Sequence, residues 1–193
     1  QTFATADNTF ENGWTWVFDV TVPENETVLN MKFADWVKGS DTISAGSNIR
    51  FSSEQSSNAK TNSPITLSSK NTYSDNLYIN RSVDLDTVKA GRQIQITVEA
   101  RIPEGSAGGS YSTSYGMKSV SDSIPVITLN GDASIINEVG SIYTDAWATA
   151  SDDLNGDITS AIMLTGTVNT SNIGKYILTY NVSDLGLNQA IPV

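Results

Sequence analysis

Alternation of apolar and polar residues with a period of two is the feature that most constrains how this chain can fold. Five apolar side chains occupy every second position from residue 14 to residue 22. Between residues 92 and 102 the same spacing places Ile94, Ile96 and Val98 on one face. Successive side chains of a strand point to opposite faces of a sheet, so this pattern predicts strands with one buried face. Helical spacing is almost absent, and we expect an all-β protein.

Turn-forming residues divide the chain into many short predicted strands. Besides the two strands above, we expect strands at 29–33, 48–53 and 76–85, and an exposed loop over 54–72 with a short strand at 65–68. Together they predict two β-sandwich domains in series, covering residues 1–118 and 125–193, with a polar linker at 119–124. The charge balance also changes there. The first 118 residues carry 10 basic and 13 acidic side chains, whereas residues 119–193 carry 1 and 8.

Composition excludes several functions. The 193 residues include no Cys and no His, which removes thiol nucleophiles, Cys/His zinc sites and the usual general base. The formal net charge of −10 does not suit binding to nucleic-acid phosphates. No stretch approaches the ~20 apolar residues of a membrane span. With 17% charged residues the surface is largely neutral and polar, as is common in extracellular β-proteins. We therefore expect a non-enzymatic extracellular protein that binds no nucleic acid.

The second half of the chain resembles a known family. The run PVITLNGDASIINEVGSIYTDAWATASDDLNGDIT, which begins at Pro125, and the run GTVNTSNIGKYILTYNVSDLGLNQA, which begins at Gly166, carry the resemblance. They are similar to the bacterial Ig-like domains found in tandem in cell-surface and secreted proteins. The resemblance implies an Ig-like sandwich, with Tyr176 at the position of a tyrosine corner, and a role as spacer, stalk or interaction module. Residues 1–118 resemble only loosely the β-sandwich domains of surface-layer and appendage proteins.

The acidic stretch ASDDLNGDIT, residues 150–159, has three interpretations. The first is a turn in which Gly156 takes a positive φ and the Asp side chains accept backbone N–H groups. The second is a calcium site assembled from separate loops, because Ca²⁺ takes six to eight oxygen ligands. An EF-hand loop is excluded, since a loop starting at Asp153 would need Gly at Ile158 and Glu at Leu164. The candidate ligands are Asp152, Asp153, Asn155 and Asp157, with Asp145 or Asp184 as a further contributor.

Catalysis by paired carboxylates is the third interpretation, and it would require a substrate cleft that a narrow Ig sandwich rarely offers. We therefore expect a turn first and an ion site second, with no other cofactor. If calcium is bound, Asp122 in the linker is a further ligand candidate, and such a site would favour an adhesin or spacer.

Assembly is the function that we expect for the whole chain: a structural subunit of a prokaryotic filament or surface layer. Subunits would associate by strand addition or by exchange of terminal segments, since the last predicted strand is short. Trp147 stands where the family commonly has Gly, on the face opposite Ala148 and Ala150. The candidate interface residues are Phe3, Phe10, Trp36, Trp147, Ile191 and Val193.

Carbohydrate binding, or binding to host or cell-surface proteins, is the alternative. Alternation predicts that Trp14 and Trp16 are buried with Phe18, which leaves Trp36 as the exposed ring for a glycan. Four Asn-x-Ser/Thr sequences permit glycosylation, at Asn25, Asn80, Asn169 and Asn181.

Overall fold

The computed structural model describes residues 3–56 and 64–193 and confirms an all-β chain. It divides into two compact units, Gln1–Ser121 (unit 1) and Asp122–Val193 (unit 2), which are treated separately below. Among the described residues the helical content is one short 3₁₀ turn, η1 (Thr159–Ala161). No helix in the described part of the chain is long and apolar enough to cross a membrane.

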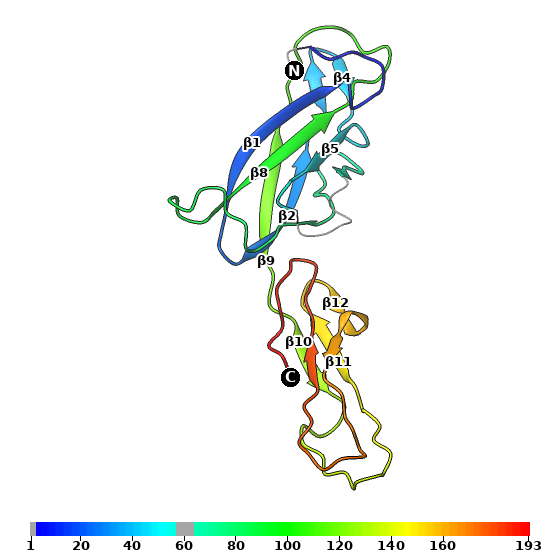
Figure 1. The fold of residues 1–193 in the computed structure, drawn as a ribbon. Coiled ribbons are helices and arrows are strands. Elements are labelled where there is room, and N and C mark those ends of the chain that lie inside the picture. The colour runs from blue at the N-terminus through cyan, green and yellow to red at the C-terminus, as the bar shows by residue number, and fades with distance from the viewer. Residues whose placement is uncertain (1–2, 57–63) are drawn as a thin grey trace. The chain divides into compact units, whose positions relative to one another are not determined.

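Unit 1 contains two main antiparallel sheets (Figure 1). The first has the order β1-β8-β5-β6, and the second has the order β7-β2-β9. A separate hairpin pairs β3 with β4. The strands are β1 (Trp14–Val22), β2 (Glu26–Phe33), β3 (Trp36–Lys38), β4 (Asp41–Ile43), β5 (Ile49–Ser52), β6 (Ile65–Thr66), β7 (Leu77–Tyr78), β8 (Arg92–Ala100) and β9 (Tyr115–Ser121).

The core of unit 1 lies between the two sheets. The predicted apolar faces of β1 and β8 are in register, with Phe18 opposite Ile96 and Val20 opposite Ile94. Met31 of β2 and Phe51 of β5 are completely buried in the same cluster, which makes the unit a sandwich. The alternation read from the sequence is therefore the pattern of this core.

The exposure predicted for the tryptophans is wrong. Trp36 is buried, at 8% exposure, whereas Trp16 is 37% exposed. Their rings stack at a centroid distance of 5.0 Å, and Trp14 lies beside both. Alternation shows which side chains of a strand share a face, but it does not show whether the strand lies at the edge or in the middle of its sheet. Because β1 is an edge strand, its apolar side is only partly covered, and Trp36 packs beneath Trp16.

The N-terminal segment packs on unit 1 itself. Thr5 donates its N–H to the carbonyl of Asn12, and Asn8 donates to that of Ile102. The Phe10 ring lies 4.2 Å from the guanidinium carbon of Arg50, so it is occupied within its own unit. A role for Phe10 in contact with another subunit stays a prediction. Phe3 is 83% exposed and remains an interface candidate.

The boundary between the units differs from the predicted linker. Strand β9 continues to Ser121 and pairs with β2 over its whole length, so residues 119–121 belong to unit 1. Asp122, the next residue, is buried in unit 2. Ser and Asp are poor strand formers in isolation, but here the pairing partner decides the conformation.

Unit 2 has short strands and a small core. β10 (Val126–Leu129), β11 (Ala148–Asp152) and β12 (Gly156–Asp157) form one sheet, and β13 (Met163–Thr165) pairs with β14 (Thr179–Asn181). Val193 pairs with Tyr180 of β14. The N–H of Tyr180 donates to the carbonyl of Val193 at 2.8 Å, and the N–H of Val193 donates to the carbonyl of Tyr180 at 3.3 Å. Val193 is 42% exposed and Ile191 is 73% exposed. The buried apolar residues are Ile127, Ala148, Ala150, Tyr180, Val182 and Ala190.

Two details of unit 2 compare directly with the sequence. Tyr176 donates its hydroxyl to the carbonyl of Asn172, 3.2 Å away, which is the hydrogen bond expected of a tyrosine corner. The apolar residues around Ile136 form no strand, and that side chain is fully exposed. Neighbouring Ile135 is also exposed, so no buried face organises this segment.

Candidate metal centre

The acidic stretch forms the turn that the sequence predicts, and the turn directs one carboxylate inward. Asp152, the last residue of β11, accepts the backbone N–H groups of Leu154 and Asn155 on its Oδ2 atom, at 3.0 and 2.8 Å. Gly156 has a φ of +69°, a conformation that favours glycine. Because Oδ2 makes both bonds, the other oxygen, Oδ1, points away from the turn.

A second carboxylate comes from the loop that follows β14. Asp184 accepts the backbone N–H of Asn188 on Oδ1 at 2.8 Å and the amide of the same residue on Oδ2 at 2.7 Å. Asp184 and Asn188 are 5% and 3% exposed. Asn155 ties this loop to the acidic turn, since its Oδ1 atom accepts the N–H of Leu185 at 3.1 Å.

The third carboxylate is Asp122, the first residue of unit 2. It is 3% exposed, and its Oδ2 atom accepts the second amide hydrogen bond of Asn188 at 3.0 Å. The next residue, Ser123, donates its N–H and its hydroxyl to Asp153, at 3.2 and 3.0 Å. These contacts fix the first residues of unit 2 beside the acidic turn.

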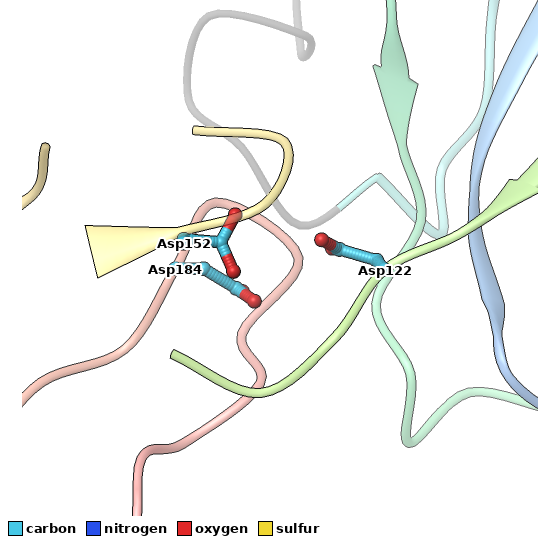
Figure 2. A group of neighbouring side chains, drawn as sticks. All are labelled: Asp122, Asp152 and Asp184. Carbon is cyan, nitrogen blue, oxygen red and sulfur yellow. The ribbon is translucent and has the colours of Figure 1, made fainter. Parts of the chain in front are cut away.

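Asp122, Asp152 and Asp184 form the acidic cluster. One carboxylate oxygen of each lies within 4.8 Å of the others, and Figure 2 shows the three side chains converging from separate segments. The Oδ1 atom of Asp152 is buried and accepts no hydrogen bond from the described residues. A buried carboxylate oxygen without a donor is costly unless a cation faces it.

The electrostatics of the cluster are unfavourable without a cation. Burial raises the pKa of Asp184, and the charge of Asp152 raises it further, although the hydrogen bonds from Asn188 act in the opposite direction. The only basic residue of unit 2 is Lys175, and it is exposed. Three clustered carboxylates repel one another, which disfavours their charged forms and favours a bound cation.

The donor chemistry selects a hard divalent cation. The cluster offers carboxylate oxygens without nitrogen or sulfur, which suits Ca²⁺, Mg²⁺ or Mn²⁺ and does not suit Zn²⁺. Ca²⁺ tolerates irregular geometry and carboxylates from separate loops, whereas Mg²⁺ requires a near-ideal octahedron and keeps more water. The arrangement fits calcium better than magnesium.

The ligand set predicted from the sequence is only partly the one that the structure brings together. Asp152 is in the cluster, whereas Asp153 binds Ser123 and Asn155 binds Leu185. Asp157 is exposed and accepts the N–H of Thr159 at 2.9 Å, which contributes to its lowered pKa. These three residues hold the loops in place and lie outside the acidic cluster, and a role for them as ligands stays a prediction.

Asp184, a further ligand candidate from the sequence, joins the cluster, whereas Asn188, which donates two hydrogen bonds to its carboxylate, was not predicted. Their spacing, Asp-Leu-Gly-Leu-Asn after a strand, is a turn signal in which an Asp side chain caps backbone N–H groups. Polar loops that follow two different strands can hold one ion together only when both strands end on the same side of the domain. The sequence does not show on which side a strand ends, because this depends on how the strands pair.

Trp147 is an interface candidate that the structure leaves half accessible. Its side chain is 39% exposed and meets the Tyr180 ring edge-on at 5.6 Å. Its φ of +66° lies in the left-handed region, which favours glycine. Asp145 accepts the Trp147 N–H at 3.0 Å and the Tyr180 hydroxyl at 2.5 Å, so it does not join the acidic cluster.

The four predicted glycosylation sites lie outside the cluster. Asn25 and Asn169 are exposed, whereas Asn80 and Asn181 are partly buried. The Oδ1 atom of Asn80 accepts the N–H and hydroxyl of Ser82, which organises the local turn. Glycosylation stays a prediction at all four.

Comparison with known proteins supports the class of unit 2. Residues 127–191 match the family described as bacterial surface protein, Ig-like domain. The resemblance read from the sequence is therefore confirmed for this part of the chain, which is similar to a module of cell-surface proteins. No curated protein and no solved structure matches the chain.

Proposed function

We propose that unit 2 is a calcium-binding Ig-like spacer domain of a bacterial surface protein. The observation that carries this proposal is the acidic cluster: three carboxylates from separate segments lie within 4.8 Å of one another, and the buried Oδ1 atom of Asp152 accepts no hydrogen bond from the described residues. A bound Ca²⁺ would remove their repulsion and tie Asp122, the first residue of the unit, to the two loops that carry Asp152 and Asp184. Calcium would therefore make the domain more rigid.

An extracellular, non-enzymatic role is part of the proposal. Extracellular calcium modules bind with dissociation constants of about 10⁻⁴ to 10⁻³ M, which matches the calcium available outside cells. A glycosidase needs two carboxyl groups on either side of a substrate, whereas Asp122 and Asp184 are buried and face each other. The matched family consists of surface domains, which supports the same location.

Filament or surface-layer assembly and binding of glycans or of other surface proteins stay predictions for the whole chain. Trp36 is buried, so a glycan would have to use the exposed Trp16 instead. An adhesin would contain the same calcium-stiffened domain as a spacer.

Calorimetric titration of the chain with Ca²⁺ tests the proposal, with Asp152→Asn as the decisive variant. The Asn side chain keeps an oxygen for the N–H groups of Leu154 and Asn155 but removes one charge from the cluster. We expect calcium affinity to fall roughly tenfold or more, a loss of about 1.4 kcal/mol in binding free energy.

The matched control is Asp157→Asn, in the same acidic stretch but outside the cluster. It should leave calcium affinity unchanged. Mg²⁺ should bind more weakly than Ca²⁺. The proposal fails if the wild-type chain shows no calcium binding up to several millimolar, or if both variants weaken binding equally.

A further inference from the structure

Unit 1 has two open strand edges on one side of its sandwich. β1 ends the first sheet and β9 ends the second, and neither has a second neighbour among the described strands. The rings of Phe18 on β1 and Tyr115 on β9 lie 6.1 Å apart, which places both edges on the same side. This side, formed by Trp14–Val22 and Tyr115–Ser121, is called the open side below.

The β1 edge of the open side has neither of the two residue types that most often protect an edge strand. β1 is nine residues long and has neither Pro nor Lys, and Val17 on its outer face is 54% exposed. Between the two edges, Trp16 and Tyr115 are 37% and 61% exposed. Long unprotected edges with apolar side chains pair readily with another strand.

The charges of the two edges are complementary. Asp19 is the only charged residue of β1, and Lys118 is the only charged residue of β9. Both are exposed, and no ion pair of the described residues includes either one. Asp19 alternates with the inward-facing Phe18, and Lys118 alternates with Met117, which packs against the core. Each charge therefore lies on the outer face of its sheet.

We propose that the open side pairs with the open side of a second copy, β1 of each copy beside β9 of the other. The second copy is related to the first by a half turn about an axis parallel to the strands. Each sheet of the first copy then continues into the opposite sheet of the second, and the outer faces of the joined sheets point the same way. Asp19 and Lys118 of the partner then lie on one face of a shared sheet. Pairing of like edges would instead bring Asp19 toward Asp19 and Lys118 toward Lys118.

This contact is isologous and closes at two copies. It uses strand addition, as the sequence predicts, but through β1 and β9 rather than through the terminal segments. It would also cover Trp16 and Tyr115, the exposed rings of the open side. The inference does not depend on calcium binding by unit 2.

Sedimentation velocity of the chain over a series of concentrations tests this inference. The wild type should show a reversible monomer–dimer equilibrium. Val17→Lys should weaken the dimer roughly tenfold or more, because a Lys on the outer face of an edge strand opposes pairing. The control is Thr66→Lys on β6, the edge strand at the other end of the same sheet, which should leave the equilibrium unchanged.

Charge exchange identifies the partner edge. Asp19→Lys and Lys118→Asp should each weaken the dimer about two- to fivefold, as expected for an exposed ion pair, and the double variant should recover most of the loss. Circular dichroism establishes that each variant is folded. A wild type that is monomeric at every concentration would overturn the proposal. A double variant whose loss of dimer affinity equals the product of the two single losses would also overturn it. The same holds if Thr66→Lys weakens the dimer as much as Val17→Lys does.

Discussion

The two units are stabilised in different ways. In unit 1 the sandwich buries large apolar side chains such as Phe51, Met31 and Leu29, each at most 1% exposed. The core of unit 2 consists of six residues, three of which are alanines. Unit 2 also buries Asp122 and Asp184. Unit 1 thus has a large apolar core, whereas unit 2 combines a small core with buried carboxylates, and the calcium ion that we propose would add stability to unit 2 alone.

The largest expected effect breaks the core of unit 1. Phe51→Ala should lower the free energy of unfolding of unit 1 by about 3–5 kcal/mol, through lost apolar burial and the cavity that remains. The unfolding of unit 2 should be unchanged. Urea titration followed by NMR signals from each unit measures both at once. Val17→Ala, at an exposed position, is the control and should change stability by about 0.5 kcal/mol or less.

Calcium should produce the next largest effect, and only in unit 2. At a calcium concentration of a hundred times the dissociation constant, the free energy of unfolding should rise by about 2.7 kcal/mol. A chelator should reverse the gain. The same urea titration with and without calcium provides the measurement. Equal stabilisation of both units would show that calcium acts nonspecifically and would remove the contrast between them.

Asp152→Asn should stabilise unit 2 without calcium and destabilise it with calcium. Without calcium, the amide removes one like charge and can donate to a neighbouring carboxylate, so unit 2 should gain about 1–2 kcal/mol. With calcium, the variant should be less stable than the wild type because a ligand charge is lost. Thermal unfolding in both conditions distinguishes this from a simple packing defect, which would destabilise unit 2 in both.

The smallest expected effect is a difference in pH dependence: a fall in pH should destabilise unit 1 and stabilise calcium-free unit 2. The pKa of Asp35 in unit 1 is lowered by the hydrogen bond from Lys70, so its contribution is present above its ordinary pKa of 3.8 and is lost as the pH falls through the lowered value. The pKa of Asp184 is raised mainly by burial, so calcium-free unit 2 should gain stability as the pH falls through that raised value toward 3.8. Chemical denaturation at several pH values checks both signs. Loss of stability in calcium-free unit 2 over that window would contradict the second.

The sequence predicted the parts that local pattern controls. Alternation gives the faces of β1 and β8, and the Asn155–Gly156 pair gives the turn, because both depend on neighbouring residues. The exposure of Trp16 and Trp36 could not be obtained in this way, since it depends on which strand lies at the edge of a sheet. The acidic cluster could be predicted only in part, because it also depends on how the strands are arranged. Asp152 lies in an evident acidic stretch, but its neighbours Asp122 and Asp184 are 30 and 32 residues away along the chain.

The most direct test of the account is a ¹H–¹⁵N NMR titration of the whole chain with Ca²⁺. We predict saturable shifts at the amides that hold the cluster, those of Leu154, Asn155 and Asn188, and no shifts in the strands of unit 1. The side-chain amide of Asn188 should move most, because it bonds to two members of the cluster, Asp122 and Asp184. Absence of shifts at these amides, or shifts spread evenly over both units, would contradict the claim that unit 2 is completed by a calcium ion.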